Sequence, residues 1–292
     1  MLGPTASGKS EVALRLAEDL GAEIISVDSM QVYRRMDIGT AKPTLEERTR
    51  VRHHGIDVVE PSAAFSVAEY QLIGRAVIEN SSVPLVIVGG SGLHFRALVD
   101  PLRFRPHDTA LKTELEELSL EESVARLKTV DAEAGQHVDL FNPRRVTRAL
   151  EIAELTGETP SSRAVSAEQK GLETYQALFP FKAVALDPGP GLEKRVTDRL
   201  HSMIEAGLVE EVAGLAAEMG RTARQAVGYK ELLPVVAGET SLEEGIDAAR
   251  RATLALAKRQ RTYFRRDPRL KWLTWSEDAD QRYRSAAAVL RS

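Results

Sequence analysis

The hydrophobic positions near the start of the chain follow two kinds of pattern. From residue 12 to residue 20 an apolar side chain recurs at every fourth position, which places one apolar stripe along a helix, and a glycine follows directly. Residues 22–28 (AEIISVD) and 83–88 (VPLVIV) are instead short apolar runs rich in β-branched side chains. Such runs are typical of buried strands. The pattern therefore predicts one amphipathic helix and two buried strands.

This succession of helices and buried strands predicts an α/β fold built on a parallel sheet. In such folds, ligands bind just beyond the carboxyl ends of the strands. Asp28 ends the first of the two runs, and the glycine-rich turn Gly89–Gly92 follows the second. We therefore expect Asp28 and this turn to lie at the same edge of the sheet.

The middle of the chain has a different character, because charged and amphipathic segments predominate between residues 106 and 181. Residues 142–157 (NPRRVTRALEIAELTG) carry the full set of helix signals. Asn142 is a favourable N-cap, Pro143 suits the first helical position, and Gly157 suits the C-terminal end. These features predict a helical insertion.

We predict the domain boundaries from this change of character. Residues 106–181 would form the helical insertion, and residues 1–105 together with 182–292 would form the core. The strand-like segment KAVALD (182–187) returns the chain to the core, and a long helix over residues 242–265 dominates the C-terminal part.

The first chemical motif stands at the very start of the chain. Residues 3–10 (GPTASGKS) fit the phosphate-loop pattern G-x-x-x-x-G-K-[ST], known from ATP-binding and other nucleotide-binding proteins. Its backbone N–H groups cradle phosphate oxygens, its lysine offsets their charge, and its final hydroxyl reaches Mg²⁺. The candidate phosphate-binding residues are Gly3, Pro4, Thr5, Ala6, Ser7, Gly8, Lys9 and Ser10. A strand normally precedes this loop, so we expect the first strand to begin upstream of Met1.

Composition narrows the range of partners. No apolar run approaches the roughly 18 residues of a membrane span, no signal peptide is present, and the chain has no cysteine, which is the pattern of a cytoplasmic protein. The net charge is −4, yet basic residues cluster locally. Residues 258–271 hold seven of them against one acid, and Arg144, Arg145 and Arg148 form a second cluster. Local patches of this kind favour binding to phosphate backbones.

Asp28 is the first candidate for a catalytic group. An acid at the end of the strand after the phosphate-loop helix can take a proton from a nucleophile aimed at the bound phosphate ester. In a small-molecule kinase, Asp28 would activate a hydroxyl that attacks the terminal phosphorus of ATP. In an alkyl transferase, it would receive the proton of an amine that attacks carbon while diphosphate leaves.

Further motifs reach beyond this generic chemistry. In order along the chain stand GPTASGKS, DSMQVYRRMDIGTAKP, GGSGLHFRAL, NPRRVTRALEI, AVGYKEL and AKRQRTYFR. Together they resemble the tRNA dimethylallyltransferases, also called tRNA isopentenyltransferases, from Gly3 to about Arg266. The resemblance implies a P-loop NTPase-like parallel sheet core with a helical insertion domain and a helical C-terminal part.

The resemblance also implies a reaction. The family transfers the dimethylallyl group of dimethylallyl diphosphate to the exocyclic amine of the adenosine 3′-adjacent to the anticodon, with Mg²⁺. Carried onto this chain, the phosphate loop holds diphosphate, with Lys9 offsetting charge and Ser10 near Mg²⁺. Asp28 accepts the proton of the amine. Ser91, where the family usually has threonine, reaches the reacting centre. His94 replaces a common tyrosine and is expected to have no catalytic role.

The same resemblance implies that the basic clusters bind tRNA, because they match the family's tRNA-contacting segments. We expect the protein to act as a monomer on the anticodon stem-loop of tRNA. The residues expected to contact tRNA are Asp28, Ser29, Met30, Gln31, Ser91, Lys112, Arg144, Arg145, Val146, Thr147, Arg148, Arg224, Gln225, Lys258, Arg259, Gln260, Arg261 and Arg265.

Two rival functions stay open at this point. A small-molecule kinase explains the phosphate loop and Asp28 equally well, but not the two basic clusters or the long insertion. An RNA-binding NTPase without transferase chemistry would hydrolyse ATP in response to RNA. The sequence favours the transferase over both.

Overall fold

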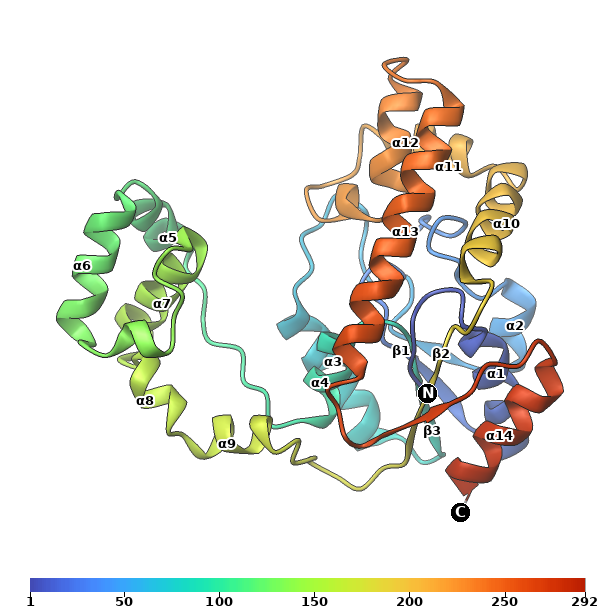
Figure 1. Ribbon diagram of the computed structural model, residues 1–292, viewed down its shortest axis with the longest axis horizontal. Coiled ribbons are helices and arrows are strands. Elements are labelled where there is room, and N and C mark those ends of the chain that lie inside the picture. Colours follow the sequence, from blue (N-terminus) through green and yellow to red (C-terminus); the bar gives the residue numbers. More distant parts are fainter. Residues whose placement is uncertain (292) are drawn as a thin grey trace. The chain divides into compact units, whose positions relative to one another are not determined.

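The chain folds into two compact units (Figure 1). The structure is a computed structural model that describes residues 1–291. The core unit comprises Met1–Leu98 together with the chain from residue 180 onward, and the insertion unit comprises Val99–Phe179. The sequence placed the insertion at residues 106–181. Its role as a separate RNA-binding domain stays a prediction.

The elements of the core unit alternate in the way that the apolar pattern predicted, and the α/β fold class is confirmed. In chain order they are α1 (Lys9–Leu20), β1 (Glu23–Ser26), α2 (Leu45–Arg50), β2 (His53–His54), α3 (Val67–Asn80), β3 (Leu85–Val88), α4 (Gly92–Val99), β4 (Ala183–Leu186), α10 (Leu192–Glu205), α11 (Leu208–Leu215), η2 (Ala223–Gln225), α12 (Tyr229–Val236), α13 (Leu242–Phe264), β5 (Leu270–Leu273) and α14 (Ala279–Arg291).

The strands within each sheet are parallel, and the first two residues of the chain lie between the two sheets. One sheet has the order β2-β1-β3, and a second pairs β4 with β5. Leu2 bridges to Gly89 after β3 and to Ala185 in β4. Its N–H donates to the carbonyl of Val184 at 2.9 Å, and its own carbonyl accepts from Leu186 at 2.9 Å. Leu2 thus occupies a strand position between the two sheets. That the strand begins upstream of Met1 stays a prediction.

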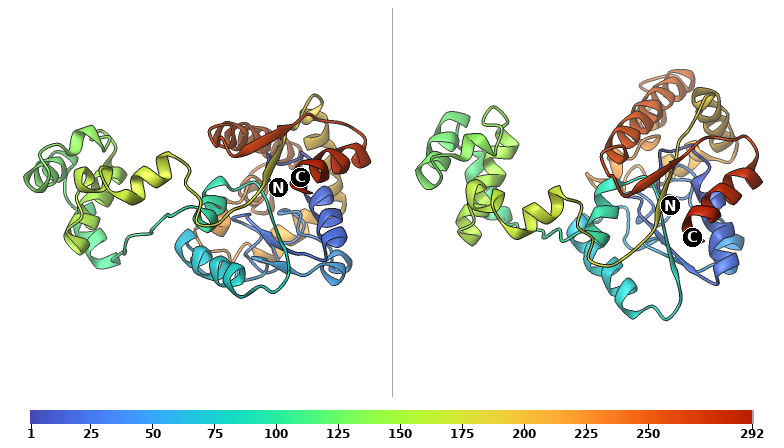
Figure 2. Two further views of the ribbon diagram at one scale, coloured as in Figure 1. Left: turned by 90° about the horizontal axis from the view of Figure 1, so that it is seen from below. Right: turned by 60° about the horizontal axis from the view of Figure 1, so that its bottom comes forward.

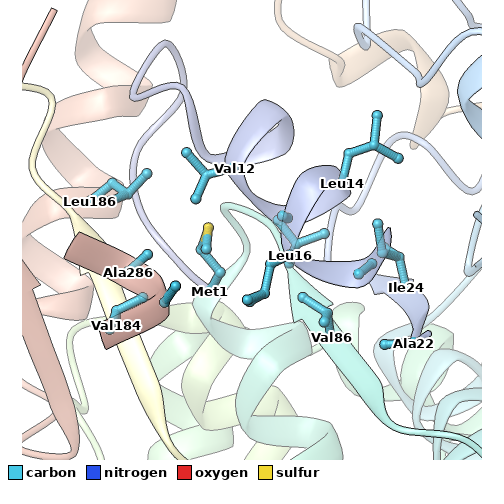
Figure 3. Packing of buried hydrophobic residues seen from close by; sticks show 14 of the residues in the cluster. Met1, Val12, Leu14, Leu16, Ala22, Ile24, Val86, Val184, Leu186 and Ala286 are labelled. Atoms are coloured by element: carbon cyan, nitrogen blue, oxygen red, sulfur yellow. The ribbon is translucent and has the colours of Figure 1, made fainter. Parts of the chain in front are cut away.

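The main apolar core lies between α1, the sheets and α14. Val12 and Leu16 on the predicted stripe of α1 pack with Val86, Val184 and other strand residues (Figure 3). Fully burying a side chain of this size contributes roughly 1.5–3 kcal/mol. The C-terminal helix α14 lies beside α1 in both views of Figure 2 and adds Ala286 to the core. The sequence analysis did not identify α14 or β5.

The insertion unit has a core of its own. Its elements are α5 (Thr109–Glu116), α6 (Leu120–Val130), η1 (Ala134–Gln136), α7 (Pro143–Thr156), α8 (Pro160–Ala164) and α9 (Ala167–Glu173). Leu115, Leu127 and Leu150 form the buried cluster. The predicted helix signals of α7 are confirmed, since the Asn142 side chain accepts from the N–H of Arg145 at 3.3 Å and Gly157 caps the helix with a φ of 72°.

Candidate functional site

The phosphate loop has the backbone shape that an anion cradle needs. Gly3 and Gly8 have φ values of 148° and 73°, which side-chain-bearing residues rarely adopt. A Cβ on Gly3 would lie 2.8 Å from the carbonyl oxygen of Leu186. No side chain caps the N-terminus of α1 at Gly8, so the N–H groups of the first helical turn remain available to an anion. The loop is therefore preformed for phosphate.

Two cations face this loop. The Lys9 ammonium donates to the Pro4 carbonyl at 3.1 Å. Burial, and then the positive charge of Arg199, lower the pKa of Lys9 to about 8, while Asp28 opposes the shift. Arg199 on α10 reaches the loop at the Thr5 hydroxyl, 3.4 Å away, and burial lowers its pKa as well. Two desolvated cations beside one loop create a strong site for an anion.

The sequence did not predict Arg199 as a site residue. It stands about 190 residues from the phosphate loop, in an ordinary amphipathic helix, and the distance of 3.4 Å to Thr5 arises only from the packing of α10. No local motif marks it.

Asp28 lies just beyond the carboxyl end of β1, as predicted. Its Oδ1 atom accepts from the N–H of Met30 at 2.8 Å and from the N–H of Gln31 at 3.3 Å, which forms a tight turn that holds the carboxylate. The side chain of Gln31 donates to the Thr40 carbonyl at 3.1 Å and accepts from Ser26 at 2.7 Å. The turn 28–31 is thus rigidly built, and Ser29 lies partly exposed within it.

A cavity of about 980 Å³ joins these groups. The phosphate loop from Thr5 onward, Asp28 and Arg199 line it together. Charged side chains such as Lys42, Arg48 and Asp57 also line it, and its apolar lining includes Met30, Ile38, Met203, Leu208, Val227 and Leu256. The cavity therefore offers charged groups for a diphosphate and apolar surface for a short hydrocarbon chain.

Ser91 follows Gly89 and Gly90, two glycines that line the cavity. Its N–H donates to the carbonyl of Val27, at 3.0 Å, so the turn after β3 is tied to the end of β1. The Ser91 hydroxyl lies 2.7 Å from Nδ1 of His94, which is buried. The expectation that Asp28 and this turn share one edge of the sheet is confirmed by the Ser91–Val27 hydrogen bond.

The basic helix α13 contributes side chains both to the site and to the exposed surface. The Gln260 side chain accepts from the N–H of Thr5 at 2.8 Å, inside the site. Arg261 and Arg265 pair with Asp187 at 2.8 and 3.4 Å. Lys258 and Arg259 are exposed and form no ion pair with any residue in the described chain. Gln260, predicted as a tRNA contact, thus lies against the phosphate loop, and the tRNA contacts of Lys258 and Arg259 stay predictions.

Arg224 and Gln225 lie in η2, exposed and outside the cavity lining. The Arg224 guanidinium donates to the carbonyls of Met219, at 2.9 Å, and Ala216. Arg224 therefore lies outside the cavity, and the tRNA contacts of Arg224 and Gln225 stay predictions.

The predicted tRNA contacts of the insertion unit differ in their availability. Arg144 and Arg145 at the start of α7 are exposed, and Thr147 is partly so. Arg148 instead forms an ion pair with the buried Glu151. Val146 is fully buried within the insertion unit, so its side chain cannot contact tRNA. The remaining predicted contact, Lys112 on α5, pairs loosely with Glu116 at 3.5 Å.

The residues present could hold Mg²⁺ only together with phosphate oxygens from a bound substrate. Among residues 1–291 no cluster of three or more histidine, cysteine or acidic side chains could hold a metal, and His53 and His54 bond to Val51 and Glu23 respectively. The Ser10 hydroxyl and the Asp28 carboxylate nevertheless line the cavity. Mg²⁺ is commonly bound by one or two protein oxygens plus substrate phosphates, and this donor set suits it.

Within residues 1–291, no helix is both long enough and apolar enough to cross a bilayer.

Comparison with known proteins gives a consistent result. The family model described as IPP transferase matches residues 31–267. The tRNA dimethylallyltransferase of Moorella thermoacetica is 45% identical, covering 99% of this chain and 92% of its own, and that of Streptomyces coelicolor is 42% identical, covering 94% and 89%. The crystal structure of the tRNA isopentenylpyrophosphate transferase from Bacillus halodurans superposes with a TM-score of 0.70 at 34% identity, covering 99% of this chain and 95% of that one. The chain therefore belongs to the IPP transferase family, and the two relatives named above are tRNA dimethylallyltransferases.

Proposed function

We propose that this protein transfers the dimethylallyl group of dimethylallyl diphosphate to the exocyclic amine of the adenosine 3′-adjacent to the anticodon in tRNA. The amine nitrogen forms a bond to the allylic carbon, and the bond from that carbon to the bridging diphosphate oxygen breaks. Diphosphate leaves with the bonding electrons, and Asp28 takes the proton that the amine loses. The products are the prenylated tRNA and diphosphate.

One observation carries this proposal above the others. The Asp28 carboxylate and the phosphate loop line the same cavity, whose lining also includes apolar side chains. A base near the anchored leaving group is the arrangement that alkyl transfer to an amine requires. The rigid turn that holds Asp28 through Met30 and Gln31 keeps the carboxylate in place before substrate arrives.

The charged end of the cavity would act on the leaving group. Lys9, Arg199 and the N–H groups of the loop would stabilise the charge that develops on departing diphosphate, a contribution that often dominates catalysis. Ser10 and the diphosphate oxygens would hold Mg²⁺, which would supply further charge neutralisation there.

The target adenosine would have to leave the anticodon loop to enter the cavity. A base inside a folded anticodon loop must leave its stack to enter a buried site, as base-modifying enzymes generally require. Ser29, Met30 and Gln31 would lie around the entering adenosine, and the Ser91 hydroxyl would reach the reacting centre and the bridging oxygen of the leaving diphosphate. The exposed cations Arg144, Arg145, Lys258 and Arg259 would contact the phosphate backbone.

Transfer of radiolabelled dimethylallyl groups into unmodified tRNA tests the proposal. Asp28→Asn keeps the Oδ1 acceptor of the turn and removes the base, so it should fold normally and lose at least a hundredfold in kcat, as expected for a general base. Asp198→Asn on the exposed face of α10 is the matched control and should retain full activity. Undiminished transfer by Asp28→Asn would remove Asp28 from its role. ATP consumption without transfer by the unaltered protein would point to a kinase.

A further inference from the structure

Ser91 and His94 form a hydrogen-bonded pair at the start of α4. The Ser91 Oγ and the His94 Nδ1 lie 2.7 Å apart, and the spacing of three residues brings the two side chains onto one face of the first helical turn. The Ser91 backbone is itself tied to Val27 at the end of β1. The hydroxyl therefore has a fixed backbone and a fixed side-chain partner.

Tyr70 on α3 holds the imidazole in place. The rings of Tyr70 and His94 meet edge to face, with centroids 4.7 Å apart and planes at 67°. The Tyr70 hydroxyl donates to the Ser26 carbonyl at 2.6 Å, and both rings are buried. Through Tyr70, the imidazole is thus anchored to the strand that carries Asp28 at its end.

The surroundings also keep His94 neutral. Burial lowers its pKa to about 4, although the negative charge of Asp28 acts in the opposite direction. A neutral imidazole has one N–H, and the other nitrogen can only accept.

We propose that His94 is a positioning residue for the Ser91 hydroxyl. In this arrangement His94 donates its Nδ1–H to Ser91 Oγ, which fixes the oxygen and leaves the Ser91 proton free to hydrogen-bond the bridging oxygen of the departing diphosphate. The opposite tautomer would take the Ser91 proton for itself and leave nothing to donate to the substrate. This inference rests on the proposed transferase function, in which Ser91 acts on the leaving group.

Two variants of His94 separate hydrogen bonding from packing. His94→Phe keeps a ring against Tyr70 and removes the hydrogen bond, whereas His94→Asn can place an amide N–H close to the position of Nδ1. If positioning is the role, His94→Phe should lower kcat about tenfold, the size expected for the loss of one hydrogen bond, with little change in KM for the donor. His94→Asn should recover most of that loss. Equal losses in the two variants would overturn the proposal.

A double-mutant cycle with Ser91→Ala tests whether the effect passes through the hydroxyl. Once Ser91→Ala has removed the hydroxyl, His94→Phe should cause no further loss of kcat. A loss of the same size in both backgrounds would show that His94 acts only through packing, and would overturn the proposal. Thermal unfolding of each variant shows whether the fold is retained.

A spectroscopic measurement reads the pair without any activity assay. In protein labelled with ¹⁵N-histidine, the Nδ1 of His94 should give the signal of a protonated nitrogen at neutral pH, and Ser91→Ala should shift it. An unprotonated Nδ1 would overturn the proposal even in an active enzyme. Absence of transfer by the unaltered protein would instead count against the proposed function, so the two failures are distinguishable.

Discussion

The backbone N–H of Thr5 in the phosphate loop donates to the side-chain oxygen of Gln260 in α13, at 2.8 Å and across 255 positions of sequence. Gly90 makes room for this contact, because a Cβ there would lie 2.4 Å from the Gln260 amide nitrogen. Gln260 therefore fills the space between the phosphate loop and the turn that leads to Ser91. Gln260 thus connects the basic helix α13 to the phosphate loop through a hydrogen bond.

Replacing Gln260 should weaken donor binding more than tRNA binding. Gln260→Leu leaves the Thr5 N–H without its acceptor, and the loss of one hydrogen bond of about 1 kcal/mol should raise KM for dimethylallyl diphosphate about fivefold. Lys258→Gln on the exposed side of the same helix is the matched control and should raise KM for tRNA only. Steady-state kinetics with each substrate varied in turn gives both values. If Gln260→Leu instead raises KM for tRNA and leaves KM for dimethylallyl diphosphate unchanged, Gln260 acts as the tRNA contact that the sequence predicted.

Donor affinity should fall as pH rises through about 8. In the free protein the pKa of Lys9 is lowered to about 8, first by burial and then by Arg199, so its ammonium is charged below that pH and neutral above it. Bound diphosphate favours the charged form, so binding takes up a proton above pH 8 and weakens there. Calorimetric titration with diphosphate from about pH 6 to pH 10 measures this. Lys9→Arg should flatten the profile, because a guanidinium stays charged, and a flat profile in the unaltered protein would contradict the assignment.

Arg199→Met should separate stability from ligand binding. Burial lowers the pKa of Arg199, which means that the free protein bears a desolvated cation. An apolar side chain of similar length should therefore leave the Tm of the free protein unchanged or higher. The increase in Tm on adding diphosphate should shrink, since affinity should fall at least about tenfold when a buried charge pair loses one partner. An unchanged diphosphate-induced shift would place Arg199 outside the anion site.

The exposed arginines of α7 should govern the salt dependence of tRNA binding. Arg144 and Arg145 are exposed, and each phosphate contact contributes roughly 0.7–0.9 to the slope of log affinity against log salt. Replacing both with glutamine should reduce that slope by about 1.5 and leave donor affinity unchanged. Filter binding at several salt concentrations measures it. Lys128→Gln with Lys170→Gln is the charge-matched control on exposed positions of the same unit, and an equal effect there would indicate non-specific attraction.

The parts of this protein that the sequence predicted are those with local causes. The phosphate loop needs glycines where φ is positive, as at Gly8, and the signal is complete within eight residues. Asn142 and Gly157 cap the two ends of helix α7, and caps can be predicted because they satisfy backbone groups within a single turn. Asp28 could be placed since a buried run that ends in an acid puts that acid at the carboxyl edge of a parallel sheet.

The other parts were decided by packing between distant segments, which leaves no periodic or motif signal. Leu2 joins two sheets because β3 and β4, almost a hundred residues apart, meet on either side of it. Arg199 and Gln260 reach the phosphate loop only because α10 and α13 pack over it. The sequence reading gave His94 no role. The fold buries it against Tyr70, so its imidazole stays neutral and its Nδ1 lies within hydrogen-bonding distance of the Ser91 hydroxyl. Local hydrogen bonding is set by neighbouring residues, whereas desolvation and partner choice exist only once the tertiary structure has formed.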